Sequence, residues 1–361
     1  MNALAPGSPE EMAAALVDAA RAGETIRLGG AFSKDSMGGP LAGKREISTR
    51  SLNRVLQYEP KDLTISVEAG MRWRDLETLL ATNRQMIPLD PWHAESTVGG
   101  VVAANISGPR RRLYGTARDM VIGMKFATLE GKLVQSGGMV VKNVAGLDMG
   151  KLMIGSYGTL AAMTNINFKL IPKPDAKRTF VFDHASVKDA AKQAGQLLKG
   201  QLQPVAIDIY RDGEVRLLIQ VEGSGSVVAR YERELKTAKA FEGAQEIEVW
   251  NGPRAMPFSS RVVVRVSCTL TEVAEVLDAL PGRAVARAGN GVVYGAFNDW
   301  QTAAAWVEAS KWTSVIETAP AECPAGVRWP RPGTAFATME KVKAMFDPQK
   351  LLNPGRLHGR L

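Results

Sequence analysis

Hydrophobic residues alternate with polar ones in some segments of the chain and recur at helical spacing in others. Every second residue from Met120 to Phe126 is apolar, which predicts a half-buried strand that turns at 130–131 into a second strand at 132–135. Leucines at helical spacing predict an amphipathic helix over 73–82. An earlier helix is predicted from the cap Ser8 to Gly23. Further strands are predicted at 25–28, 63–68 and 166–170.

The segment Pro172-Lys173-Pro174 marks a boundary, because two prolines interrupt regular structure and the pattern changes after them. Beyond it, strands and helices alternate in two series. The first series is a strand at 179–182, a helix at 186–198, a hairpin of 205–210 with 214–221, a helix at 227–239 and a strand at 246–250. The second is a strand at 261–267, a helix at 271–280, a hairpin about 289–291, a helix at 300–310 and a strand at 313–317.

Such alternation predicts an α+β region whose antiparallel sheet carries helices on one face, as in ferredoxin-like units. A last helix is predicted at 335–346, and the chain then reaches the segment Asn353-Pro354-Gly355-Arg356. The fold class predicted for the whole chain is therefore α+β.

Composition narrows the function classes. The 361 residues include 45 Lys+Arg against 37 Asp+Glu, a net charge of +8. Aromatic residues do not alternate with basic ones, and Arg110-Arg111-Arg112 is too short for a nucleic-acid-binding arm, so no nucleic-acid partner is expected. Two cysteines cannot hold an iron–sulfur cluster, and three widely separated histidines make no local metal motif. No apolar run long enough for a transmembrane helix and no signal peptide are visible, so a cytoplasmic protein without a metal is expected.

The 35 glycines are more informative than the charge, because they are clustered. The first cluster is Gly29-Gly30-Ala31-Phe32-Ser33-Lys34, which follows a predicted strand. Its backbone N–H groups, a hydroxyl and an ammonium group can converge on one anion, which predicts a cradle for a diphosphate. The alternative is a glycine-rich surface turn.

The second cluster follows Asp90 and His93 and contains small residues that would let backbone lie flat against a large planar ligand. Its members are Thr97, Val98, Gly99, Gly100, Ala103 and Ala104, and the run extends to Gly108, Tyr114 and Gly115. The alternative is a helix start, capped by Ser96 or Thr97, that packs closely on a sheet. His93 is a weak candidate for a catalytic base, and a satisfied polar residue is the competing interpretation. Arg110–Arg112 is either a solvated turn or a clamp for substrate.

A third pair of segments is Lys142–Asp148 and Gly155–Leu160. The glycines of the second segment can make a tight helix-to-strand turn, or they can form a wall against an adenine ring. This functional interpretation depends on the combination with the first two clusters.

In this order, the segments resemble the FAD-binding domain of the vanillyl-alcohol-oxidase (PCMH-type) superfamily. The chain is similar in particular to the family of glycolate oxidase FAD-binding subunits, through Tyr58-Glu59-Pro60, Ser107–Arg111, Lys142–Asp148 and the ending Leu352–Arg356. The resemblance implies an FAD-binding domain at 1–174 with subdomains at about 1–86 and 87–174, an α+β cap domain at 178–330, and a return of 331–361 to the FAD-binding domain. The segment 178–330 matches only in length and in its order of strands and helices.

The resemblance also implies FAD bound between two subdomains. Its diphosphate loop corresponds to Gly29–Lys34, and its second cofactor segment corresponds to Asp90, Thr97, Val98, Gly99, Gly100, Ala103, Ala104 and Gly108, with Tyr114 and Gly115 beside them. Met163 falls where the family lines the adenine. No histidine precedes His93, so covalent attachment near the first loop is excluded and noncovalent FAD is expected.

Three functions remain open at this point. The first is a flavoprotein subunit of a complex that oxidises a 2-hydroxy acid such as glycolate, together with a larger FAD-linked subunit and an iron–sulfur subunit, at most peripheral to the inner face of a membrane through these partners. The second is a self-sufficient dehydrogenase whose base is His93 or Tyr210. The third is a scaffold that keeps the FAD fold without electron transfer. Arg331 and Arg356 could bind a carboxylate, although the sequence brings neither to a base.

Overall fold

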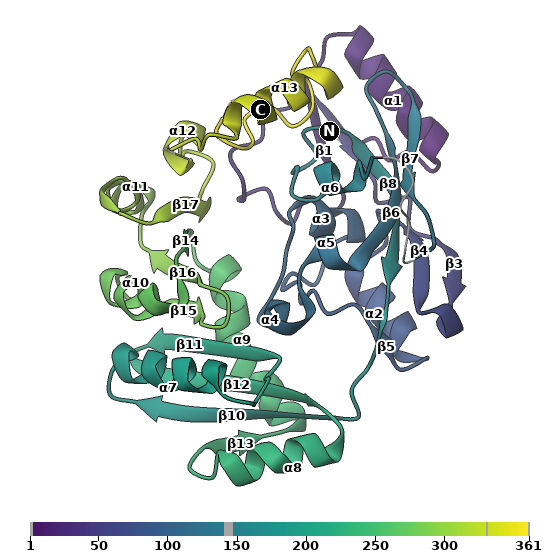
Figure 1. Ribbon diagram of the computed structural model, residues 1–361. Coiled ribbons are helices and arrows are strands. Elements are labelled where there is room, and N and C mark those ends of the chain that lie inside the picture. The colour runs from purple at the N-terminus through teal and green to yellow at the C-terminus, as the bar shows by residue number, and fades with distance from the viewer. Residues whose placement is uncertain (1–2, 141–146, 330, 360–361) are drawn as a thin grey trace. The chain divides into compact units, whose positions relative to one another are not determined.

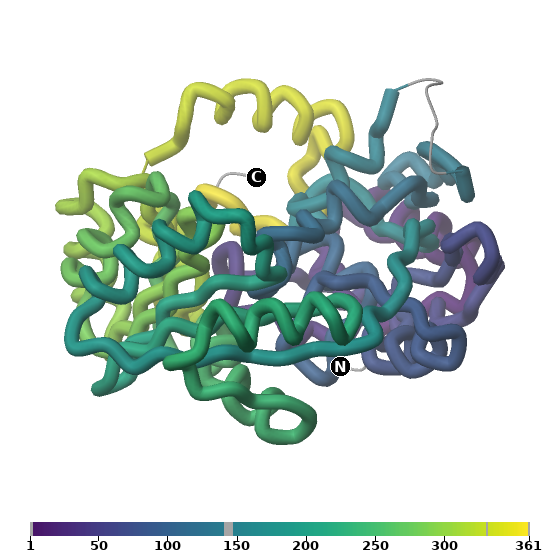
Figure 2. The backbone as a smooth tube through the Cα atoms, turned by 60° about the horizontal axis from the view of Figure 1, so that its bottom comes forward, coloured from purple at the N-terminus to yellow at the C-terminus, as the bar shows by residue number. Residues whose placement is uncertain are grey.

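The computed structural model in Figure 1 describes residues 3–140, 147–329 and 331–359. The chain forms two compact units. Unit 1 contains Met1–Ser107, Gly115–Lys173 and Pro324–Leu361, and unit 2 contains Gly108–Tyr114 and Pro174–Cys323. The colour gradient in Figure 2 follows the chain out of unit 1 and back into it. No helix among the described residues is long and apolar enough to cross a membrane.

The first layer of unit 1 is built from its N-terminal helix and a parallel strand pair. Ser8 caps α1 (Pro9–Arg21) by accepting from the Glu11 N–H, as the sequence predicts. The helix buries its apolar stripe against β1 (Ile26–Gly29) and against Leu352 of the C-terminal tail. Strand β1 pairs in parallel with β2 (Arg45–Ser48), and both end beside the glycine-rich loop.

The second layer of unit 1 is a five-stranded antiparallel sheet in the order β3-β4-β8-β6-β7. Its strands are β3 (Val55–Glu59), β4 (Thr64–Glu68), β8 (Ala162–Lys169), β6 (Val121–Ala127) and β7 (Leu133–Gly137). The division into subdomains near residue 86 is corrected by this sheet, because β4 pairs with β8 through Val67 and Ile166. Segments from both sides of that boundary therefore share one sheet.

Short elements connect these layers. They are η1 (Pro60–Asp62), α2 (Trp73–Ala81), β5 (Gln85–Met86), α3 (Val98–Ala103), α5 (Ala117–Met120), α6 (Gly150–Met153) and β9 (Ile171–Pro172). Helix α2 agrees with the predicted amphipathic helix and buries Trp73, Leu76 and Leu80.

Unit 2 is one continuous eight-stranded antiparallel sheet in the order β13-β10-β12-β11-β15-β16-β14-β17. The first series is β10 (Ala176–His184), α7 (Val187–Lys199), β11 (Ala206–Asp212), β12 (Glu214–Gly223), α8 (Gly225–Glu234) and β13 (Lys239–Phe241). The second is β14 (Val262–Ser267), η2 (Leu270–Glu272), α10 (Val273–Ala279), β15 (Ala284–Arg287), β16 (Val292–Phe297), α11 (Trp300–Ala309) and β17 (Thr313–Thr318). Within each series the strands lie in the order fourth, first, third, second, and β11 and β15 join the two halves. The predicted α+β class and the ferredoxin-like units are confirmed.

The predicted strand at 246–250 is wrong. These residues lie in α9 (Gly243–Ser259), and the fourth strand of the series is β13. Glu246 and Trp250 are one helical turn apart, and both contact Thr179 of β10 from the same side, at 3.0 and 2.8 Å. The neighbouring Phe180 points to the opposite side of the sheet and stacks on Tyr231 of α8. Helix α9 therefore covers the face that we expected to carry no helix.

The segment Gly108–Tyr114 corrects the predicted domain boundaries. It contains the short helix α4 (Arg111–Tyr114) and belongs to unit 2. Arg112 donates to the carbonyl of Pro204 at 2.6 Å, and the Tyr114 hydroxyl donates to Glu222 at 3.0 Å. The chain returns to unit 1 at Pro324, earlier than the expected residue 331.

The C-terminal tail completes unit 1. It contains α12 (Ala325–Arg328) and α13 (Phe336–Phe346), shown in yellow in Figure 1. After α13 the backbone runs beside β1, where the Ile26 N–H donates to the Leu351 carbonyl at 2.7 Å and the Asn353 N–H donates to the Ile26 carbonyl at 2.9 Å.

Candidate cofactor site

Unit 1 contains an open cavity between the loop after β1, helix α3, the turn at 157–158 and the tail. Many of the residues that the sequence singled out line it: Gly29, Gly30, Ala31, Phe32, Ser33, Lys34, Thr97, Gly99, Gly100, Ala103, Ala104 and Met163. The first two glycine clusters, about 65 residues apart in sequence, therefore meet at one site.

The loop Gly30–Lys34 keeps its N–H groups available. The carbonyls of Gly29 and Gly30 accept from the Thr49 N–H at 2.9 Å and the Ser48 hydroxyl at 2.8 Å. Among the described residues, however, none of the backbone N–H groups of Gly30–Lys34 has an acceptor. Half-buried N–H groups without partners cost free energy, and an anion in the cavity would supply the acceptor.

The aromatic ring of Phe32 fixes the shape of this loop. Phe32 has φ +53°, and its ring packs under the Arg27 guanidinium at 4.4 Å. Arg27 in turn pairs with Asp35 and Glu46. A Cβ on Gly29 would lie 2.6 Å from the ring of Phe32, so glycine is required there for packing.

Helix α3 approaches the loop so closely that only glycine fits between them. Thr97 caps α3 by accepting from the Gly100 N–H at 3.2 Å. A Cβ on Gly30 would lie 2.1 Å from the Thr97 hydroxyl oxygen. Gly99 packs against the backbone of Ala69, whereas a Cβ on Gly100 would approach the Lys34 ammonium at 3.6 Å. The helix-cap and ligand interpretations of this segment therefore describe the same residues.

Two cationic side chains line the cavity. The Lys34 ammonium donates to the hydroxyls of Ser96 at 2.9 Å and Ser33 at 3.3 Å, and burial lowers its pKa to about 8. Arg356 is 4% exposed, and burial lowers its pKa to about 10. Of the described lining residues, Asp35 alone is a carboxylate, and it already pairs with Arg27. The surplus positive charge and the free N–H groups fit a dianionic diphosphate.

Other predicted site residues do not line the cavity. Val98 is fully buried in α3, and Asp90 lies outside the wall with φ +53°. Gly108 and Tyr114 belong to unit 2. Gly115 is required by its turn, because a Cβ added there would lie 2.3 Å from the Asp119 carboxylate. Most of the segment Lys142–Asp148 falls outside the described residues.

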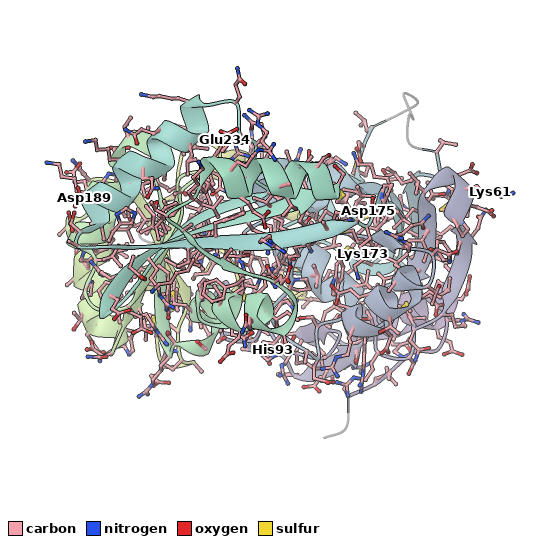
Figure 3. All side chains as sticks on the ribbon, turned by 90° about the horizontal axis from the view of Figure 1, so that it is seen from below. Lys61, His93, Lys173, Asp175, Asp189 and Glu234 are labelled. Carbon is pink, nitrogen blue, oxygen red and sulfur yellow. The ribbon has the colours of Figure 1, made fainter. Side chains whose placement is uncertain are left out.

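The weak catalytic candidate His93, labelled in Figure 3, is exposed and is not part of the cavity wall. Partial burial and the nearby Lys34 charge lower its pKa. Its imidazole is therefore neutral at pH 7 and can accept a proton.

Sequence reasoning missed other wall residues: Leu28, Asp35, Thr49, Ala69, Ala161, Asn353 and Arg356. Tyr157 and Gly158 also line the cavity, and they belong to the segment Gly155–Leu160, for which a wall against an adenine ring was one of the two interpretations. Asn353 and Arg356 carried a signal, because they belong to the conspicuous ending Asn353-Pro354-Gly355-Arg356. Nothing in the local pattern placed that ending beside β1.

Comparisons with known proteins agree with this geometry. Residues 2–137 match the FAD binding domain, and residues 327–357 match the C-terminal domain of FAD linked oxidases. Over these two segments the chain is similar to the FAD-linked oxidases. The two matched segments contain the loop and the tail that meet at the cavity, and FAD is the cofactor of this chain.

Among its relatives is the glycolate oxidase subunit GlcE of Escherichia coli, 29% identical over 92% of each chain. The glycolate oxidase subunit GlcD of Bacillus subtilis is 30% identical over half of this chain but only 38% of its own length. The D-lactate dehydrogenase of Anaerostipes hadrus is 30% identical over 37% of its length. A solved structure of alkyldihydroxyacetonephosphate synthase shares the fold, with a TM-score of 0.70 at 19% identity over 97% of this chain and 75% of that one.

The Lys34 ammonium predicts a pH-dependent affinity for FAD. In the FAD-free protein it loses its proton near pH 8, whereas the diphosphate of FAD would hold it charged at higher pH. Binding above pH 8 then takes up a proton, so we expect the dissociation constant to rise by up to about tenfold per pH unit above pH 8 and to be flat below it. Flavin fluorescence titrations from pH 6.5 to 9.5 measure this.

Two variants control this experiment. Lys34→Arg should flatten the profile, because a guanidinium keeps its charge over this range. Lys61→Met, which removes an ammonium that extends into solvent (Figure 3), should leave the profile unchanged. A pH-dependent profile in Lys34→Arg would assign the titration to another group. The free energy of unfolding of the FAD-free chain changes with pH in the opposite direction to the affinity for FAD. It rises from pH 8 towards 10.5, because Lys34 keeps its proton in the unfolded chain over this range but loses it in the folded chain.

Proposed function

We propose that this chain is the FAD-binding subunit of a complex that oxidises a 2-hydroxy acid, with glycolate as the foremost substrate. The observation that carries this proposal is its similarity to GlcE along nearly the whole length of both chains. The larger partner would be an FAD-linked subunit similar to GlcD, and an iron–sulfur subunit would receive the electrons. We place the complex in the cytoplasm, peripheral to the membrane through these partners.

In this proposal FAD is bound noncovalently, and when bound it accepts two electrons and passes them on. The N–H groups of Gly30–Lys34 and the Lys34 ammonium would hold the diphosphate. The small residues of α3 would let the cofactor approach the backbone, and Met163 would contribute the wall beside the adenine. No histidine lies among the described residues of the wall, which supports noncovalent attachment.

Oxidation of a 2-hydroxy acid also needs a base for the hydroxyl proton and a cation for the carboxylate. Tyr210 is a poor base, because its hydroxyl donates to Asp212 at 2.8 Å and burial raises its pKa to about 12. The His184 ring is 2.7 Å from the Gln193 amide oxygen in unit 2, and the His358 ring packs on Phe336 with 4.6 Å between centroids. These contacts favour a subunit that does not oxidise substrate alone.

The self-sufficient dehydrogenase remains the second candidate, and His93 is the observation in its favour. Its imidazole lies close enough to Lys34 for the ammonium charge to disfavour protonation of the ring, which keeps His93 neutral and able to accept a proton. A scaffold without electron transfer is the third candidate. The cavity does not favour it, because a scaffold has no need of unpaired N–H groups and buried cations.

One experiment separates the three candidates. The chain is purified alone and together with the larger FAD-linked subunit and the iron–sulfur subunit. FAD released by acid is quantified, and reduction of a dye is followed with glycolate, D-lactate and L-lactate. We expect one FAD in the supernatant, turnover by the isolated chain far below 1 s⁻¹, and turnover in the usual enzyme range only in the complex.

The other outcomes have distinct meanings. Turnover of about 1 s⁻¹ or faster by the isolated chain, abolished in His93→Ala, would establish the self-sufficient dehydrogenase. A folded chain that binds no FAD would establish the scaffold. Flavin that stays with the precipitated polypeptide would contradict noncovalent attachment.

A further inference from the structure

The C-terminal tail reaches the cavity through one buried amide. The side-chain amide oxygen of Asn353 accepts from the Leu28 N–H at 2.7 Å. The side-chain NH₂ group of Asn353 donates to the backbone carbonyls of Leu28 at 3.0 Å and Tyr157 at 2.8 Å. Leu28 and Tyr157 lie on different walls of the cavity. Asn353 is 2% exposed and has φ +43°, a backbone conformation that asparagine tolerates better than most residues. This side chain therefore couples the end of β1 to the turn at 157–158.

Three residues further on, Arg356 brings a guanidinium to the cavity wall. Its terminal nitrogens make only long contacts with the Lys34 carbonyl, at 3.3 and 3.4 Å, and lie 3.8 Å from Asp35. Its Nε atom is buried, and no described residue accepts from it. An arginine fork with this much unused donor capacity is unusual in a protein interior, where buried polar groups are paired.

Lys34 and Arg356 reach the cavity from opposite ends of the chain. Lys34 contacts two hydroxyls, and Arg356 shares Asp35 with Arg27, so the described wall does not neutralise both cations. A diphosphate brings two negative charges and oxygens that match the planar donors of a guanidinium. The site offers one lysine and a row of N–H groups from the loop 30–34, and the tail adds Arg356 as a second cation.

We propose that Arg356 binds the diphosphate of FAD and that Asn353 is a positioning residue that holds β1 and the 157–158 turn at the spacing this contact needs. This inference rests on the assignment of FAD to the cavity. It makes the tail a direct part of the cofactor site, in addition to its packing on β1.

The test compares ligands that differ in phosphate. FAD binding is followed by flavin fluorescence, and ADP and adenosine are measured as competitors of FAD. We expect Arg356→Met to weaken FAD and ADP by about 10- to 100-fold, the usual range for a hydrogen bond to a charged group, and to leave adenosine unchanged. Arg356→Lys should restore part of the loss, since it keeps the charge and loses the fork. Arg74→Met, on the exposed side of α2, is the matched control and should bind all three ligands as the wild type does.

Asn353→Ala gives the second readout. Because Asn353 joins two walls and does not contact the diphosphate, Asn353→Ala should weaken the binding of ADP and of adenosine by the same factor. The unfolding temperature of the FAD-free variant should also fall. The inference is overturned if Arg356→Met binds ADP as the wild type does. It is also overturned if Arg356→Met loses ADP and adenosine equally while its unfolding temperature falls, since Arg356 would then only pack. A wild-type chain that binds no FAD would instead contradict the assignment of FAD itself.

Discussion

Replacing Gly30 with alanine is expected to weaken FAD binding by at least about 100-fold, equivalent to about 2.7 kcal/mol. The new Cβ would lie 2.1 Å from the hydroxyl oxygen and 2.8 Å from the Cβ of Thr97, so the loop and α3 must move apart. Overpacking of this kind costs about 1–3 kcal/mol on its own. The same movement displaces the N–H groups that face the cavity, so the free energy of FAD binding should fall by more than the free energy of unfolding. A flavin fluorescence titration of the FAD-free protein measures the effect.

Two other glycines calibrate this result. Gly100→Ala places its Cβ 3.1 Å from the Thr97 hydroxyl and 3.6 Å from the Lys34 ammonium, and we expect a loss of roughly tenfold because less must move. Gly195→Ala in α7 has open space around the new Cβ, so FAD binding should not change and stability should rise by up to about 1 kcal/mol. Wild-type affinity in Gly30→Ala would show that the loop is not part of the site, and Gly100→Ala tests the same point if Gly30→Ala does not fold.

Replacing Lys343 with methionine is expected to destabilise the FAD-free chain by about 3–5 kcal/mol, the usual cost of removing one partner of a buried ion pair. The Lys343 ammonium is almost fully buried and donates to Asp347 at 2.7 Å and to the carbonyls of Thr159 at 2.7 Å and Leu352 at 3.0 Å. Methionine would leave the Asp347 carboxylate buried without its cation, although the N–H groups of Leu351 and Leu352 would still donate to it. The urea midpoint should therefore fall with an unchanged slope.

Lys341→Met is the matched control, because Lys341 lies on the same helix α13 but is exposed. Its stability should stay within about 0.5 kcal/mol of the wild type. The double variant Lys343→Met/Asp347→Asn should lose less than the sum of the two single losses, because the pair is coupled. Equal losses in Lys343→Met and Lys341→Met would mean that the buried ammonium contributes nothing specific.

Much of the fold was predictable from local patterns. The alternation along 120–126 and the helical spacing along 73–82 gave β6 and α2 at nearly their observed bounds. The strand predicted at 246–250 was wrong because polar and apolar residues alternate there over only five residues, which is too short to distinguish a strand from a helix. The helical state of this segment becomes clear only from Glu246 and Trp250 meeting Thr179, a contact across more than 60 residues.

The site was predictable where its parts carry their own chemistry, and hidden where partners are distant in sequence. Glycine next to serine and lysine indicates an anion cradle by composition, so the sequence singled out the loop 29–34, which lines the cavity. The role of Asn353 depends on Leu28, 325 residues away, and no local pattern encodes that pairing. Tyr114 was assigned to the cofactor because of its neighbours in sequence, whereas its hydroxyl binds Glu222 in unit 2.

The discontinuity of unit 1 has a consequence for biosynthesis. On a translating ribosome, residues 1–173 emerge long before the tail that donates to Leu28, and the segment Pro174–Cys323 of unit 2 is made in between. At about 5–20 residues per second, the N-terminal part waits roughly ten to forty seconds for its last wall. The cavity has all of its described wall only after Arg356 has been synthesised, so we expect FAD to bind after that step and not to the N-terminal part alone.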